Sequence, residues 1–184
     1  MSRFSMGKSE EILSGSLIVC VMKKSNIWLY AGGKYGKMGG RKNGERGNHM
    51  ILIVCVDDHN GMMFNHRRQS QDRILRADIL ELTDGKKLWM NAYSRKQFAE
   101  SDAEKILVDE TFLDAAGDGE FCFVENADVS GCAERIEEIY LYRWNRDYPA
   151  EVYFPVDLSV WKCVETKEFA GSSHEKITRE RYTR

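Results

Sequence analysis

Residues 57–72 hold a dense run of side chains that could do chemistry. The run comprises Asp57, Asp58, His59, Asn60, Asn65, His66, Arg67, Arg68, Gln69, Gln71 and Asp72. Binding residues concentrate in polar loops of this kind, and a pair of arginines suits paired hydrogen bonds to a phosphate or carboxylate. We therefore take six of them as candidate ligand-binding residues: Asp57, Asn60, Arg67, Arg68, Gln69 and Asp72. The alternative is that residues 57–61 form a turn and that the arginines lie on a solvated surface.

The sequence nominates no catalytic residue and no metal site. His59 and His66 have no recognisable nucleophile partner. The five cysteines form no C-x-x-C pair and the four histidines are scattered, so we expect no structural metal. An odd number of cysteines, mostly inside apolar runs, indicates reduced thiols, and we expect a cytoplasmic protein. No apolar run approaches the roughly 20 residues that span a bilayer, so we expect no membrane partner.

The net charge of −2 conceals two parts of opposite charge. Residues 1–49 carry 9 Lys and Arg against 3 Glu, a balance of +6, and the remainder carries −8. The first part also holds 9 of the 15 glycines, and its segment 31–49 shows no apolar period and no strand bounded by turns. We predict that 1–49 is a basic, glycine-rich, disordered extension and that 50–184 is one α/β domain.

Two other interpretations of residues 1–49 stay open. One is a basic arm that binds nucleic acid. The other is a start-site extension, because Gly-Glu-Arg-Gly at 44–47 can be encoded by a purine-rich run at ribosome-binding distance from the Met50 codon. Under that hypothesis, translation begins at Met50.

Apolar runs and turn signals alternate from residue 50 onward. Asp72 is a suitable N-cap, and Ser94 with Gln97 three residues later forms a capping box. Strands separated by helices imply a mostly parallel sheet with right-handed crossovers, closed by an antiparallel hairpin at one edge. The predicted strands are 51–56, 87–91, 105–108, 120–124, 139–144, 160–169 and 176–182, and the predicted helices are 73–82, 94–98, 109–117 and 128–138.

Three stretches in this order resemble dihydrofolate reductase. LIVCVDDHNG (52–61) is similar to the family's first strand and following loop, and LWMNAYSRKQF (88–98) to a strand and the helix start after it. Residues 136–169 are similar to a strand, a D-x-x-FP turn and the Trp-bearing strand of the last hairpin. The resemblance covers roughly residues 50–183 and implies a three-layer α/β fold.

The chain departs from the family where the pterin ring would bind. There a carboxylate on the first helix binds the ring through paired hydrogen bonds and assists protonation, and a threonine on a later strand supports it. The resemblance puts these positions near Leu75 and Tyr142, which cannot do that work. Tyr142 joins the candidate ligand-binding residues. Asp72 and Asp78 flank Leu75, and each is either a relocated acid or a capping or solvated residue.

The cofactor side departs as well. Glu125 and Asn126 stand where the family has glycines beside the dinucleotide, and an acid beside a pyrophosphate is electrostatically unfavourable. The family's arginine for a 2′-phosphate is missing at Ala92. Ser94 and Arg95 are left as a candidate anion-binding pair at a helix start, although capping alone explains Ser94. The cofactor is thus unknown, and NADPH is possible with degraded motifs.

These observations lead to three hypotheses. The first is a divergent dihydrofolate-reductase-like protein that binds a small nucleotide- or pterin-like ligand, with altered or lost reductase activity. The second is an NADPH-dependent reductase of a different heterocycle, so that an enzyme, if the chain is one, would be an NAD(P)H-dependent oxidoreductase. The third is an RNA-linked protein, which the −8 charge of residues 50–184 opposes.

Overall fold

The computed structural model describes residues 10–13, 16–23, 26–31, 34–37, 49–98 and 105–184. The chain divides into two compact units, Met1–Glu45 and Arg46–Arg184. The first contains an antiparallel sheet in the order β1-β2-β3-β4. Its strands are β1 (Glu10–Leu13), β2 (Ser16–Lys23), β3 (Asn26–Ala31) and β4 (Lys34–Lys37). The sequence predicted no strand in 31–49, and β4 corrects that.

The second unit is built on a seven-stranded sheet in the order β13-β14-β11-β5-β10-β8-β9. The pairs from β11 through β5, β10 and β8 to β9 are parallel, and β11-β14 and β14-β13 are antiparallel. This confirms the predicted α/β class with its C-terminal hairpin. The strands are β5 (Met50–Val56), β8 (Leu88–Met90), β9 (Ile106–Val108), β10 (Phe121–Val124), β11 (Ile136–Arg143), β13 (Lys162–Phe169) and β14 (Ile177–Thr183).

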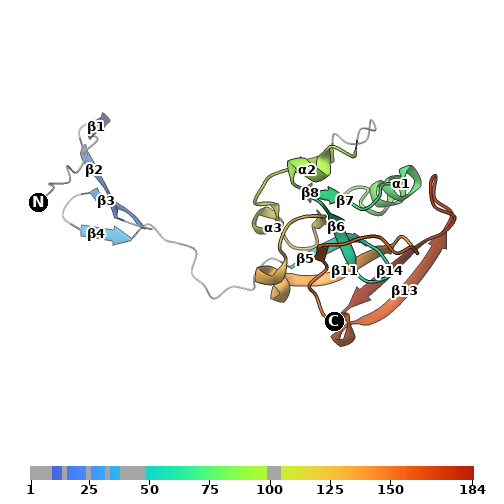
Figure 1. The fold of residues 1–184 in the computed structure, drawn as a ribbon. Coiled ribbons are helices and arrows are strands. Elements are labelled where there is room, and N and C mark those ends of the chain that lie inside the picture. The colour runs from blue at the N-terminus through green and yellow to red at the C-terminus, as the bar shows by residue number, and fades with distance from the viewer. Residues whose placement is uncertain (1–9, 14–15, 24–25, 32–33, 38–48, 99–104) are drawn as a thin grey trace, which may run out of the picture. The chain divides into compact units, whose positions relative to one another are not determined.

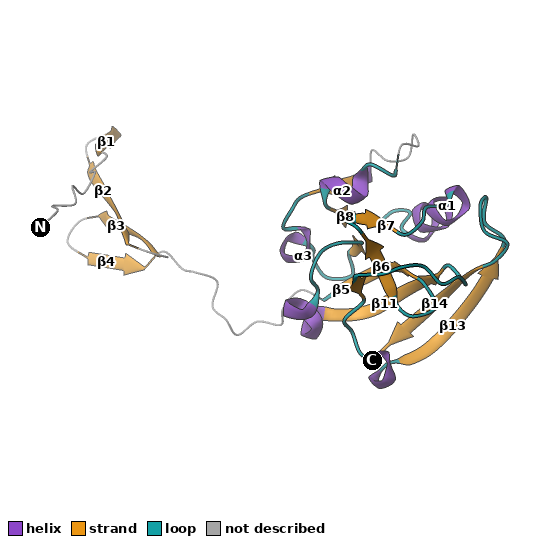
Figure 2. Ribbon diagram, viewed as in Figure 1, coloured by secondary structure: helices purple, strands orange, loops and turns teal. Residues whose placement is uncertain are grey.

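The central strand β5 explains the layered architecture. Its apolar run is buried on both faces, as parallel central strands are. Leu52 and Val54 pack on one side with α3 (Phe112–Ala115) and the 3-10 helix η2 (Ser130–Arg135). On the opposite side, Ile51 and Ile53 pack against α1 (Arg73–Leu82). The helices therefore enclose the sheet from two sides (Figure 2).

The polar segment 57–72 is more ordered than the sequence indicated. It contains β6 (Gly61–Phe64) and β7 (Arg67–Arg68), which form a three-stranded sheet with β12 (Val152–Tyr153) in the order β12-β6-β7. Phe64 pairs with Arg67. Asn65 and His66 between them have φ angles of 48° and 58°, which a two-residue type I′ turn requires. The loop is therefore a hairpin held at one edge.

The capping box predicted at Ser94 is wrong. Helix α2 runs from Ala92 to Arg95, and its N-cap is Asn91, whose side chain accepts a hydrogen bond from the Ser94 N–H at 3.0 Å. Asparagine is among the best N-cap residues, and Asn91 directly follows β8. Ser94 consequently lies inside the first turn and is buried.

Asp72 fixes the position of α1, as the sequence predicted for a cap. Its carboxylate accepts hydrogen bonds from the Ile74 and Leu75 N–H groups at the start of α1. It also accepts from the backbone N–H groups of Ser172 and Ser173, at 3.0 and 2.7 Å, in the turn between β13 and β14. One buried carboxylate thus joins the helix to the C-terminal hairpin.

A substitution at Gly171 tests the junction that Asp72 makes between α1 and the C-terminal hairpin. A Cβ atom at Gly171 would lie 2.5 Å from the Asp72 Oδ2 and 2.8 Å from the Ile177 Cδ1. We expect Gly171→Ala to lower the free energy of unfolding by about 1–3 kcal/mol, as overpacking does. Gly131→Ala is the control, because a Cβ there meets nothing within 4 Å. Urea denaturation measures both, and equal stability of the two variants would contradict the assignment.

Candidate functional site

The carboxyl ends of three neighbouring parallel strands meet at one edge of the sheet. β10 lies between β5 and β8, and the residues that follow the three strands are Asp57, Asn91 and Glu125. In parallel α/β sheets, ligands bind outside the carboxyl ends of the strands. The Asn91 Nδ2 donates a hydrogen bond to the Asn126 Oδ1 at 2.7 Å, so the ends of β8 and β10 are tied together.

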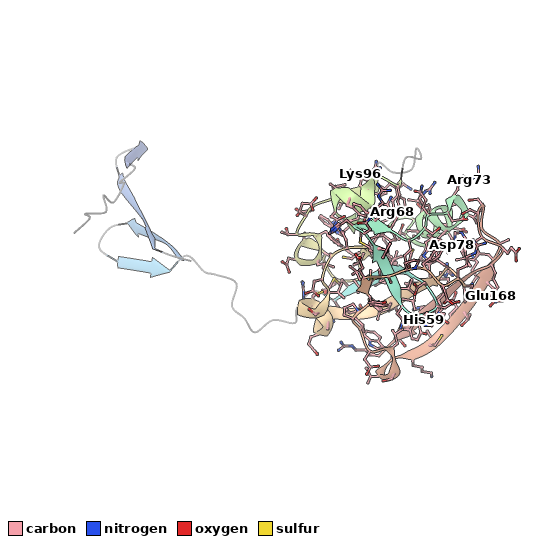
Figure 3. The ribbon with its side chains drawn as sticks, viewed as in Figure 1. His59, Arg68, Arg73, Asp78, Lys96 and Glu168 are labelled. Atoms are coloured by element: carbon pink, nitrogen blue, oxygen red, sulfur yellow. The ribbon has the colours of Figure 1, made fainter. Side chains whose placement is uncertain are left out.

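A forked ion pair between Arg68 and Glu125 occupies this edge. The Arg68 Nε and Nη2 donate to the two Glu125 carboxylate oxygens at 2.8 and 3.1 Å. The side chain of Arg68 is 20% exposed and that of Glu125 is 8% exposed. The sequence suggested that Arg67 and Arg68 receive a phosphate or carboxylate of a ligand, or else lie on a solvated surface. In the structure, Arg68 binds a carboxylate of the chain itself. Arg68 is labelled in Figure 3.

Tyr93 completes the surroundings of Arg68. The Arg68 guanidinium carbon lies 4.7 Å from the centroid of the Tyr93 ring, within the range of a cation–π contact. The Arg68 Nη2 also donates to the Tyr93 carbonyl at 3.1 Å, and the Arg68 backbone N–H donates to the Tyr93 hydroxyl at 2.8 Å. Arg67 is exposed instead, so the two arginines do not act as one receptor.

Asp57, Asn60 and Gln69 shape the loop. The buried Asp57 accepts from the Gly61 N–H at 2.7 Å and from the Gln69 Nε2 at 2.7 Å. Asn60 has a φ of 64° and accepts from the Arg143 Nη1 at 3.1 Å. These contacts agree with the turn interpretation. The Gln69 Oε1 is buried, with no hydrogen-bond partner in the described part of the chain.

Asp72 belongs to a second buried network, away from Glu125. Its Oδ2 lies 3.3 Å from the His174 Nδ1, and the other ring nitrogen of His174 lies 3.2 Å from the Ser70 hydroxyl. Burial alone would raise the pKa of Asp72. The hydrogen bonds from Ser172, Ser173 and His174 outweigh burial and hold the pKa far below its usual range. The carboxylate is charged and structural.

Tyr142 and Asp78 form a third network. The fully buried Tyr142 donates to the Asp78 Oδ2 at 2.7 Å. Lys167 and Arg179 donate to the Asp78 carboxylate at 2.6 and 2.8 Å. Burial would raise the pKa of Asp78, but the bonds from Lys167 and Tyr142 and the charge of Arg179 lower it. Asp78 is therefore ionised at neutral pH and is unsuited to donate a proton. Leu75, 1% exposed, packs beside it in the core.

Ser94 and Arg95, the predicted anion-binding pair, make separate contacts in the structure. The Ser94 hydroxyl is buried and has no hydrogen-bond partner among the described residues. The Arg95 guanidinium turns away to the carbonyl of Phe98. Helix α2, with four residues, is also too short for a strong dipole.

Cys55 and Tyr93 lie at this end of the sheet and are not among the candidate residues predicted from the sequence. Burial raises the pKa of the Cys55 thiol, the Glu125 carboxylate raises it further, and Arg68 opposes both. Val54 pairs with Val124 in the sheet, so Cys55 and Glu125 follow at the same end of two neighbouring strands. For Cys55, the available signal in the sequence was a single thiol near the carboxyl end of an apolar strand. For Tyr93, the sequence offered no signal beyond its position shortly after β8.

A hollow of 230 Å³ adjoins the end of β10. Its lining consists of Met62, Val124, Asn126, Ala127, Asp128, Val129, Val152, Tyr153, Phe154 and Pro155. This volume suits one ring system and is smaller than the usual pocket for a drug-sized molecule. A larger hollow of 380 Å³ lies beside α1, but Leu88 and Ile106 in its wall begin their strands, so it is at the opposite end of the sheet.

The comparisons agree with this fold. No protein-family model matches the sequence, and a search of curated proteins gives no match. Among solved structures, the chain is similar to dihydrofolate reductase from Enterococcus faecalis complexed with NADP(H) and RAB-propyl. The identity is 14% and the TM-score 0.53, covering 74% of this chain and 96% of that one. The fold is thus dihydrofolate-reductase-like, and at this identity the likeness shows the fold alone. No described helix is long and apolar enough to cross a membrane.

The charge of Asp72 predicts acid lability. Because the folded-state pKa is lowered, its stabilising effect is complete above the unfolded-state pKa near 4 and is lost as pH falls below that value. We expect Asp72→Asn to be less stable than the wild type by about 1–3 kcal/mol at neutral pH. The gap should narrow as pH falls from about 5 toward 2. Urea denaturation across this range checks it, and a gap independent of pH would contradict it.

Substitutions of the two neighbouring arginines should differ in their effect on the free energy of unfolding. We expect Arg68→Met to lower the free energy of unfolding by about 1–3 kcal/mol, because the mostly buried Glu125 carboxylate loses its cation. Arg67→Met should stay within about 0.5 kcal/mol of the wild type, since Arg67 is exposed. Chemical denaturation of both variants measures the difference. Equal losses of unfolding free energy in the two variants would show that the ion pair with Glu125 does not stabilise the fold.

Proposed function

We propose that this chain is a small-molecule-binding protein on a dihydrofolate-reductase-like fold. Its ligand is nucleotide- or pterin-like and binds at the carboxyl ends of β5, β8 and β10. The protein does not reduce dihydrofolate. The observation that carries the proposal is the group of side chains at the strand ends, where Glu125 and Tyr93 hold a planar cation. The ion network around Asp78, which pairs with Lys167 and Arg179, accounts for the lost reduction.

The loss of dihydrofolate reduction follows from this network. Reduction of dihydrofolate needs an acid beside the ring that can assist its protonation, and position 75 offers a buried leucine. Asp78 lies one turn later, its two oxygens taken by Tyr142, Lys167 and Arg179. Freeing this carboxylate for a ligand would break its ion pairs with Lys167 and Arg179 and leave Arg179 paired with Glu165 at 2.9 Å. Breaking such pairs is unfavourable for a carboxylate that is mostly buried.

Ligand binding is supported by groups at the strand ends. Glu125 provides a carboxylate and Tyr93 an aromatic ring, and both already hold a planar cation. The Ser94 hydroxyl beside Tyr93 is buried without a partner in the described residues. The 230 Å³ hollow opens next to Asn126. Convergent polar groups beside an apolar hollow are the usual features of a small-molecule site.

A second candidate is an NADPH-dependent reductase of another heterocycle. The Enterococcus faecalis enzyme of similar fold is complexed with NADP(H), which favours it. The acidic side chain of Glu125 opposes it, because that carboxylate would lie beside the cofactor's pyrophosphate.

Melting temperatures and turnover test the proposal together. At ten times its dissociation constant, a ligand contributes about 1.4 kcal/mol, a rise of about 3–6 °C for a domain of this size. We expect such a rise with guanosine or pterin compounds, and no dihydrofolate-dependent oxidation of NADPH. Dihydrofolate turnover by the purified full chain, or no rise with any nucleotide or pterin, would overturn it.

NADPH alone separates the two candidates. A rise in melting temperature with NADPH, together with quenching of tryptophan emission, would favour the reductase. A rise with guanosine or pterin compounds and none with NADPH favours binding without hydride transfer.

A further inference from the structure

We propose that Glu125 recognises the ligand through a guanidine-like edge, and that Arg68 holds this place in the free protein. The ligand class is a 2-amino-4-oxopyrimidine ring, as in guanine and pterins. This inference rests on the proposed function and specifies which atoms of the ligand are read. Glu125 lies at the end of β10, on a different element from the α1 carboxylate that the resemblance leads one to expect.

The Arg68 guanidinium makes the contacts that such a ring would make. It is planar and gives two N–H donors from one carbon to the two oxygens of Glu125, at 2.8 and 3.1 Å. In guanine and pterin, the ring N–H and the exocyclic amino group on the same carbon form an equivalent pair of donors. A carboxylate accepts both pairs in the same forked geometry.

Tyr93 supplies the second contact that a planar ligand would make, a stacking contact on its face. Its ring lies 4.7 Å from the guanidinium carbon, so the cation is bonded at its edge and covered on a face. Heterocyclic bases are held in the same way, by stacking on an aromatic side chain and hydrogen bonding at the ring edge. Neither contact depends on a charge in the ligand.

The two partners differ in their freedom to move. Glu125 follows a buried strand and its side chain is 8% exposed. Arg68 extends from the two-residue strand β7 at the edge of the small sheet, and its side chain is 20% exposed. Arginine also regains hydration and rotamer freedom when it leaves. When a ligand breaks this pair, Arg68 is therefore the partner that leaves and Glu125 is the partner that stays.

A hollow also lies at the end of β10. Its 230 Å³ are lined by Val124 and Asn126, on either side of Glu125 in the chain, while Glu125, Arg68 and Tyr93 are not part of the lining. Its wall also contains Met62, Val129 and Phe154, which are apolar surfaces suited to a heterocycle. The Asn126 amide adds a polar group at the same end.

Two pairs of compounds, each differing at the amino group, test the recognition. Guanosine and inosine 5′-monophosphates differ only in the 2-amino group, and pterin and lumazine differ at the equivalent position. We expect guanosine monophosphate or pterin to bind the full-length wild type roughly 10–100-fold more tightly than its partner, because the partner leaves a charged acceptor unpaired. Which pair shows the difference identifies the source of the ring. Calorimetry measures the affinities.

Variants of the pair distinguish this inference from the general proposal. Glu125→Gln should abolish the preference within each pair of compounds, and Glu137→Gln, an exposed acid on β11, should retain it. Arg68→Ala should bind guanosine monophosphate or pterin more tightly, since the internal competitor is gone. Equal binding of both members of a pair by wild type and Glu125→Gln would overturn the inference and leave the proposed function standing. No binding of any compound by any variant would overturn both.

Guanidinium ion is a direct probe of the vacated place. Millimolar guanidinium chloride should raise the melting temperature of Arg68→Ala and should not raise that of the wild type or Arg67→Ala. If Arg68→Ala folds only when guanidinium is added, the inference is supported equally. A lowering of the melting temperature in all three proteins would overturn it. Arg68→Lys, which keeps the charge without the fork, should fold and show no such rescue.

Discussion

A carboxylate buried at the end of a central strand needs hydrogen-bond donors, and in the free protein much of the structure at this edge serves to provide them through Arg68. Glu125 receives Arg68 from a segment 57 residues earlier in the chain. To deliver it, the segment folds into the β6–β7 hairpin, whose tight turn places Asn65 and His66 in the left-handed region. Asp57 and its partners brace the base of that hairpin. Removing Arg68 without a replacement would leave the Glu125 carboxylate unpaired, at a cost of about 1–3 kcal/mol, so a ligand that displaces Arg68 must bring hydrogen-bond donors of its own.

The same fold holds two acids in contrasting states. Asp78, on α1, is surrounded by Lys167, Arg179 and the Tyr142 hydroxyl, and its lowered pKa keeps it charged and bonded. Glu125, at the end of β10, has a forked partner, Arg68, that comes from a surface hairpin. An acid with three fixed partners stabilises the fold. An acid with one displaceable partner is suited to recognition, and the proposed function follows from this difference.

The sequence predicted elements whose signal is local. Continuous apolar runs gave the central strands, and Asp72 marked the start of α1. Misses came where the signal was weak or distant. The β6–β7 turn uses Asn65 and His66 rather than the glycine that usually marks such a turn. Ser94 was predicted as a cap from its spacing to Gln97, but Asn91, three residues earlier, caps the helix instead. Contacts such as Arg68 with Glu125 join positions far apart in the chain, and no single-sequence pattern specifies them.

The Arg68 side-chain N–H resonance gives the most direct test of the central claim. In the free protein this Nε–H is bonded to Glu125 at 2.8 Å, so its NMR signal should be shifted downfield and slow to exchange with water. Saturation with guanosine monophosphate or pterin should move the signal to the position of a solvent-exposed arginine, and inosine monophosphate or lumazine should not. A signal that stays in place while guanosine monophosphate or pterin binds would show that Arg68 is a permanent part of the fold, and would contradict the account.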